Sequence, residues 1–162
     1  MTSNENPEMC ASCDDSCCKR CPGICFPEDF GSNRTDVIAA VKAALDSGRY
    51  CIDWWEGDPR YNSNYDEKGG RLPDRMSSTN FIRPAEKGEE GRLRHPLWVC
   101  KNGCTFLLST GCELSFEQRP LQCRALVPKE DKECSMNDMY SKQSAAIAWI
   151  PYHEWLNSLG RA

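Results

Sequence analysis

The chain contains 162 residues with a formal net charge of −4, and 12 of the residues are cysteines. Leu, Ile, Val and Phe make up only 16% of the sequence, below the roughly 20% that an ordinary apolar core requires, so cross-links or metal ions are expected to supply part of the fold. No apolar run approaches the ~18 residues of a membrane helix, and the acidic balance does not suit a nucleic-acid-binding protein. We therefore expect one domain over residues 1–162, with neither a membrane nor a nucleic acid as its partner.

The cysteines are densest near the start of the chain. Six of them lie within residues 10–25, at Cys10, Cys13, Cys17, Cys18, Cys21 and Cys25. A C-x-x-C spacing lets two sulfur atoms reach one metal ion. Residues 1–30 also carry the whole net charge of −4, which thiolates would increase and a bound cation would offset. This segment is therefore the first candidate metal site.

Several chemistries are compatible with these cysteines. The N-terminal segment lacks the basic and apolar regions of a secretory signal, so we expect a cytoplasmic protein whose thiols are reduced. Zinc would take four thiolates in a tetrahedron, whereas an iron–sulfur cubane would take one thiolate per iron, and the spacing fits both. The adjacent Cys17 and Cys18 side chains diverge, so they would serve two metal ions or two edges of a cluster unless the backbone bends. A disulfide-bonded scaffold is a further alternative, which the missing signal disfavours.

A helix and two strands are predicted in the next third of the chain. Residues 35–47 predict a helix with Thr35 as its N-cap and Gly48 as its stop. Its apolar stripe consists of Val37, Ile38, Val41, Ala44 and Leu45. Residues 49–55 predict a strand, and residues 79–83 predict a partner strand. Cys51, in the first strand, is equally compatible with a buried core thiol and with a metal ligand.

The connections between these elements are polar. Residues 56–79 predict a long loop, and such loops in compact domains tend to be functional or disordered. Tyr61 and Tyr65 within it are interpreted as solvated, with contact to a partner as the alternative. Residues 85–96 predict a second polar loop.

The second half of the chain contains further cysteines and two predicted helical segments. Residues 97–108 predict a tight hairpin whose K-N-G turn brings Cys100 and Cys104 close together. Residues 114–119 predict a short helical turn that Pro120 ends. Arg119 and Arg124 are expected either to stabilise nearby thiolates or to pair with Glu113 or Glu117.

The C-terminal residues predict mainly helix. Residues 136–150 predict a helix with Asn137 as its N-cap, followed after Pro151 by a short final helix. Trp149 and Trp155 are expected to pack on the domain. The two histidines, His95 and His153, are interpreted as surface or packing residues, and no hydrolase, P-loop or dinucleotide-binding motif is present.

Two stretches resemble the zinc- or iron-chelating CxxCxxCC family. CASCDDSCC, residues 10–18, is similar to the opening motif of that family, and CTFLLSTGCELSFEQRPLQCR, residues 104–124, is similar to its second half. The flagellin lysine methylases carry a similar cysteine set, which is proposed to hold an iron–sulfur cluster. The resemblance covers roughly a third of the chain, and residues 31–97 match no family.

The resemblance implies a metal site built from both stretches. The implied ligands are Cys10, Cys13, Cys17, Cys18, Cys104, Cys112 and Cys123. Cys21, Cys25 and Cys100 are further candidates that the resemblance does not fix, and neither Cys51 nor Cys134 is assigned by it.

These observations lead to one interpretation and one alternative. We expect a small irregular α+β domain, metal-stabilised and helix-rich at its C-terminal end. Its expected function is that of an iron–sulfur protein, with a [4Fe–4S] cluster and a redox or catalytic accessory role beside an unidentified protein or redox partner. The resemblance and the cysteine-only ligand set favour iron–sulfur over zinc. The alternative is a zinc-stabilised structural or interaction module without enzymatic activity.

Overall fold

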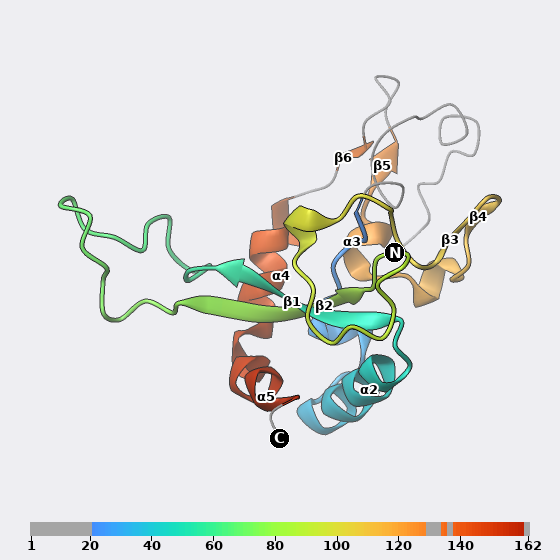
Figure 1. The fold of residues 1–162 in the computed structure, drawn as a ribbon, viewed down its shortest axis with the longest axis horizontal. Helices are drawn as coiled ribbons and strands as arrows, with labels where there is room; N and C mark the ends of the chain where they lie inside the picture. Colours follow the sequence, from blue (N-terminus) through green and yellow to red (C-terminus); the bar gives the residue numbers. More distant parts are fainter. Residues whose placement is uncertain (1–20, 129–133, 136–137, 161–162) are drawn as a thin grey trace.

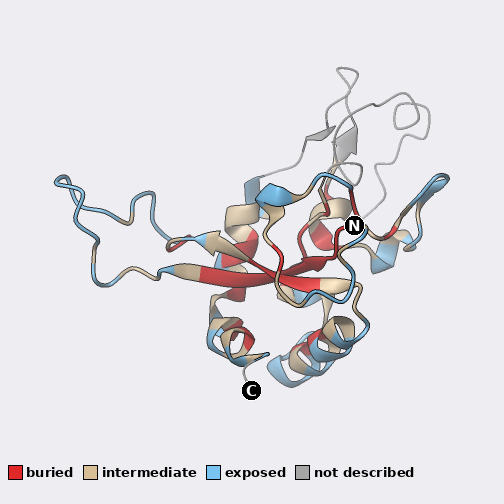
Figure 2. Cartoon of the chain, viewed as in Figure 1, coloured by how far each residue is buried: buried red, intermediate tan, exposed pale blue. Residues whose placement is uncertain are grey.

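Two antiparallel strands form the centre of the structure, a computed structural model that describes residues 21–128, 134–135 and 138–160 (Figure 1). Strand β1 (Tyr50–Glu56) pairs with β2 (Ser78–Pro84), with Cys51 opposite Arg83 and Ile52 opposite Ile82. Both strands are largely buried (Figure 2), because other segments cover the hairpin on both faces. The predicted strands at 49–55 and 79–83 are thereby confirmed within one residue.

The first helix, α2 (Arg34–Asp46), packs against β1. Its Val37 and Val41 are buried, which confirms the predicted apolar stripe. The predicted N-cap is wrong: Asn33 caps the helix, and its side chain accepts a hydrogen bond from the amide of Asp36 at 2.9 Å. Asn33 has extended backbone angles, as an N-cap requires, whereas Thr35 already lies inside the helix.

Two helices at the C-terminal end pack against β2. Helix α4 (Lys142–Trp149) begins after Ser141, whose hydroxyl accepts from the amide of Ser144 at 3.1 Å. The predicted helix over 136–150 is therefore shorter at its start, and the proposed cap Asn137 lies outside the described residues. A 3₁₀ turn, η6 (Ile150–Tyr152), contains Pro151 and leads into α5 (His153–Ser158).

The remaining elements are short. They are the 3₁₀ turns η2 (Pro27–Asp29), η3 (Leu97–Val99), η4 (Phe116–Gln118) and η5 (Asp138–Tyr140), helix α3 (Leu121–Arg124), and strands β3 (Leu107–Leu108), β4 (Gly111–Cys112), β5 (Val127–Pro128) and β6 (Cys134–Ser135). Strands β3 and β4 pair with each other, as do β5 and β6, so the described chain contains three two-stranded antiparallel sheets. The short turn predicted at 114–119 is confirmed by η4. Helices and antiparallel sheets together confirm a small mixed α+β fold.

The hairpin predicted over residues 97–108 is wrong. Residues 97–99 form η3, and Cys104 pairs instead with Glu86 across an isolated bridge. The Glu86 carboxylate accepts hydrogen bonds from the amides of Lys101 and Asn102. A side chain from an earlier part of the sequence therefore holds this turn, and the K-N-G sequence alone does not form it. The tight hairpin lies further along, where β3 and β4 meet.

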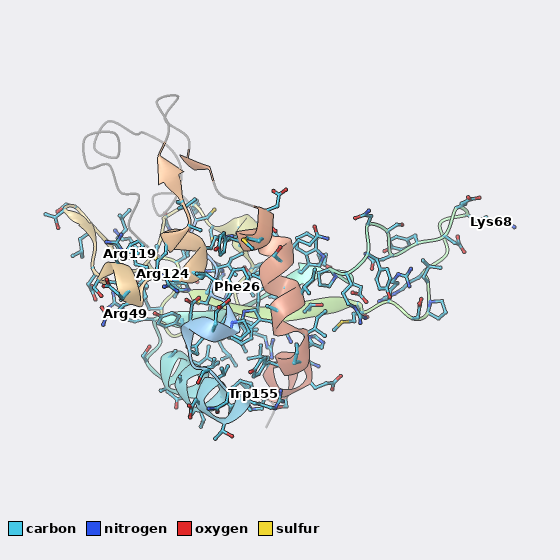
Figure 3. The ribbon with its side chains drawn as sticks, turned by 180° about the vertical axis from the view of Figure 1, so that it is seen from behind. Phe26, Arg49, Lys68, Arg119, Arg124 and Trp155 are labelled. Atoms are coloured by element: carbon cyan, nitrogen blue, oxygen red, sulfur yellow. The ribbon has the colours of Figure 1, made fainter. Side chains whose placement is uncertain are left out.

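The connection between β1 and β2 spans residues 57–77, because Glu56 and Ser78 form the last pair of the ladder, and it extends far from the hairpin (Figure 1). Much of it is exposed (Figure 2), and Lys68 lies at its tip (Figure 3). Tyr65 is exposed, and Tyr61 is stacked beneath the guanidinium of Arg75 at 3.5 Å. Within the described part of the chain, no helix has both the length and the apolar character that crossing a membrane would need.

Candidate metal centre

Residues 21–26 run through the core, and separate elements hold them there. The amide of Cys25 donates to the carbonyl of Ile82 in β2 at 3.0 Å. The amide of Ile24 donates to the side chain of Gln122 in α3 at 2.9 Å, and the indole of Trp149 in α4 donates to the carbonyl of Cys25 at 2.8 Å. These contacts fix the point at which the cysteine-rich start of the sequence meets the folded domain.

Helix α3 brings Cys123 to this segment. The Asp29 carboxylate accepts hydrogen bonds from the amides of Phe26 and Leu121 and from the guanidinium of Arg124, so η2 and α3 are tied together. A Cβ atom built on Gly23 would lie only 2.1 Å from the sulfur of Cys123. The Cys123 thiol therefore packs directly against the backbone two residues after Cys21.

Cys104 and Cys112 contribute two further thiols. Cys104 is only 4% exposed, and its thiol interacts electrostatically with those of Cys25 and Cys112. Burial, with a smaller contribution from Cys112, raises the pKa of the Cys104 thiol to about 11, although the amide of Phe106 opposes the shift. Burial likewise raises the pKa of Cys25 well above its usual value.

The predicted ligands therefore divide into two groups. Cys10, Cys13, Cys17 and Cys18 lie outside the described residues. Among the described ones, Cys25 interacts electrostatically with Cys104, Cys104 with Cys112, and Cys21 with Cys100, while Cys123 packs against Gly23. Within the described residues, no three thiols lie within 4.8 Å of one another. None of the seven cysteines whose side chains the structure describes is bonded to another of them.

A buried cation lies among these thiols. Arg83 is fully buried in β2 and pairs with the equally buried Asp53 at 2.8 Å. Its charge acts to lower the pKa values of four thiols, those of Cys25, Cys51, Cys100 and Cys104. Sequence analysis missed this residue, since a charged residue in a strand usually faces solvent.

A mixed group of ligand atoms lies beside the thiols. One oxygen of Glu86, one ring nitrogen of His95 and the sulfur of Cys100 lie within 4.8 Å of one another. His95 is 4% exposed and its Nε2 lies 2.9 Å from the Glu86 carboxylate. His95 is thus a buried residue rather than a surface one, and its carboxylate partner was not predicted.

The protonation of these thiols limits what they can do alone. Burial, together with the charges of Glu86 and Cys21, raises the pKa of Cys100 to about 12 against the opposing effect of Arg83. Burial raises the pKa of Cys51 to about 11. Thiols with such raised pKa values are poor nucleophiles at neutral pH, whereas a metal ion binds thiolates by displacing their protons. The arrangement suits metal binding better than thiol catalysis.

The ion pair predicted for Arg124 needs correction, whereas an effect of the two arginines on nearby thiolates stays a prediction. Arg124 pairs with Asp29, not with Glu113 or Glu117. Glu113 pairs with Arg49, and the guanidinium of Arg119 donates to the carbonyl of Leu114 at 3.2 Å. These three arginines gather on one side of the molecule (Figure 3). His153 has a packing role, because its Nδ1 accepts the amide of Asn80 at 3.0 Å.

No family model, no curated protein and no solved structure matches this chain. The functional argument consequently rests on the resemblance of the cysteine pattern and on the geometry described above.

Proposed function

We propose that this protein binds metal through cysteine thiolates drawn from both halves of the chain. The proposed ligands are Cys10, Cys13, Cys17, Cys18, Cys104, Cys112 and Cys123. One observation supports the proposal: the Cys123 thiol packs against Gly23, and the Cys104 thiol interacts electrostatically with that of Cys25, so two thiols from later segments lie around residues 21–25. Cys18 precedes Cys21 by three residues in the sequence, so chain length alone allows the opening cysteine motif to reach this segment.

The proposed cofactor is an iron–sulfur cluster, of the [4Fe–4S] type, that serves a redox or catalytic accessory role. The resemblance to the CxxCxxCC family and the cysteine-only ligand set support it. An electron-transfer role would need an unidentified redox partner but no acid–base pair.

A zinc-stabilised interaction module without enzymatic activity is the alternative. The low content of large aliphatic residues favours it, because a domain with a small apolar core depends on its metal to fold. Under this alternative the thiolates would hold zinc in closed tetrahedral sites, and the function would lie in binding a partner.

A set of cysteine substitutions tests the proposal. Cys104→Ser and Cys123→Ser in the full chain are expected to lose the metal of the thiolate centre, measured as metal per chain in anaerobically purified protein. Cys51→Val is the matched control, because Cys51 is buried in β1 and is not a proposed ligand. Full metal content in the first two variants would overturn the ligand assignment.

A further inference from the structure

His95 has a buried ring nitrogen that no described residue satisfies. Its Nε2 lies 2.9 Å from the Glu86 carboxylate, while Nδ1 is buried and has no hydrogen-bond partner in the described part of the chain. The carboxylate can only accept, so Nε2 carries a proton, and in the neutral imidazole Nδ1 then presents a lone pair. A buried lone pair without a donor is costly, and a metal ion would satisfy it.

The Glu86 carboxylate is held firmly in this orientation. Its other oxygen accepts the amides of Lys101 at 2.5 Å and Asn102 at 2.6 Å. Burial alone would raise the pKa of Glu86, but these amides and His95 outweigh burial and lower it. The same anionic carboxylate therefore positions the imidazole and the turn that follows Cys100. Metal-binding histidines commonly donate their second ring N–H to such a carboxylate.

The backbone of His95 is equally well fixed. Its amide donates to the carbonyl of Ile52 in β1 at 3.0 Å, and its carbonyl accepts from the guanidinium of Arg83 at 2.7 Å. The Cys100 thiol makes only a long contact of 3.8 Å to the carbonyl of Pro96. Binding a metal would thus cost this sulfur no strong hydrogen bond.

We propose that His95 Nδ1 and the Cys100 sulfur bind a divalent zinc ion, with Glu86 as the residue that orients the imidazole. One ring nitrogen of His95 and the Cys100 sulfur already lie within 4.8 Å of each other, and water would fill the remaining coordination positions of the ion. Imidazole nitrogen and thiolate sulfur are the donors that zinc prefers. This site is separate from the proposed thiolate centre, whose ligand set includes neither His95 nor Cys100.

Zinc content of the full chain is the first test. We expect His95→Gln and Cys100→Ser each to lose one zinc ion per chain, while iron and acid-labile sulfide stay at the wild-type level. His153→Gln and Cys51→Val are the matched controls and should retain the zinc. Glu86→Gln should weaken zinc affinity by roughly 10- to 100-fold, as loss of such an orienting partner does. Unchanged zinc content in the His95 and Cys100 variants would overturn the proposal.

A measurement on the wild-type protein covers the case in which a variant fails to fold. Cadmium-113 replaces zinc in ¹⁵N-labelled protein, and NMR then detects scalar coupling between the cadmium and the ring nitrogens. Coupling to His95 Nδ1 is expected; its absence, with Nδ1 protonated or hydrogen-bonded to water, would refute the site. The two proposals fail separately, because iron and sulfide report on the thiolate centre and the cadmium coupling reports only on His95.

Discussion

Individual residues in this protein depend on partners far away in the sequence. Cys123 packs against Gly23, and Glu86 binds both His95 and the amides that follow Cys100. Sequence patterns assigned Cys123 and Cys104 to one metal-binding motif, and that assignment stays a prediction. They placed His95 in a polar stretch, because neither its burial nor its contact with Glu86 produces a local periodic signal.

Gly23 is expected to be essential for the position of Cys123. The methyl group of Gly23→Ala would meet the Cys123 sulfur at 2.1 Å, and such overpacking typically costs about 1–3 kcal/mol of the free energy of unfolding. Denaturant unfolding of Gly23→Ala measures the loss. Adding Cys123→Ala should relieve the clash, so the two substitutions should be strongly non-additive. Additive effects would show that the contact is absent.

Cys51 is expected to make stability sensitive to alkaline pH. Burial raises its pKa from 9.0 to about 11, so the folded state keeps a proton that the unfolded state releases. The contribution of the protonated Cys51 thiol to the free energy of unfolding should therefore be fully present below pH 9. It should be lost as the pH rises from about 9 to 11. Thermal melts across this range should show a smaller decline for Cys51→Val than for the wild type. An equal decline in both would assign the effect to other groups.

At the scale of elements, the helices and the central hairpin followed from local pattern, whereas the connections did not. Apolar spacing predicted α2, and aromatic and β-branched residues predicted β1 and β2. Helix α3 was missed because Pro120 was interpreted only as a stop, although proline is also well suited to precede a first helical turn. The 97–108 hairpin failed because the Glu86 side chain overrides the local turn signal.

The 57–77 loop is expected to depend on one buried carboxylate at its base. Asp58 is fully buried and accepts hydrogen bonds from Arg60 and from the amide of Met76. Asp58→Asn should lower the free energy of unfolding by about 1–3 kcal/mol and speed proteolysis of the loop. Asp74→Asn is the control, because Asp74 is exposed and its pairing with Arg75 contributes little. Equal effects of the two substitutions would contradict the anchoring role.

The same carboxylate should produce an acid-dependent loss of stability. The hydrogen bonds from Arg60 lower the pKa of Asp58 well below its usual value of 3.8, against the opposing effect of burial. Its contribution to stability is therefore present above pH 3.8 and is lost as the pH falls towards the folded-state pKa. The Asp58→Asn variant should lack this component of acid unfolding.

For the whole molecule, the predicted elements gave the fold class but not its arrangement. The predicted helices and strands indicated a small α+β domain, and the mixed fold agrees. The threading of residues 21–26 between β2, α3 and α4 depends on contacts between residues about one hundred positions apart. Periodicity describes only near neighbours in the sequence, so it carries no information about such contacts.

Metal and folding are expected to be linked across the whole chain. Cys13→Ser should remove metal and destabilise the fold by several kcal/mol, as loss of a structural ligand does. Cys134→Ser, which removes a cysteine outside the proposed ligand set, should leave metal content and Tm nearly unchanged. Loss of stoichiometric metal in the Cys134 variant would show that the division between ligands and other cysteines is wrong.

The central claim is most directly tested by quantifying iron, acid-labile sulfide and zinc in the full chain purified without oxygen, together with its visible spectrum. The account predicts iron and sulfide in cluster stoichiometry with broad visible absorption. Colourless protein that contains only zinc would contradict the cluster and support the interaction module. Protein that is folded but contains no stoichiometric metal would contradict cysteine-ligated metal binding altogether.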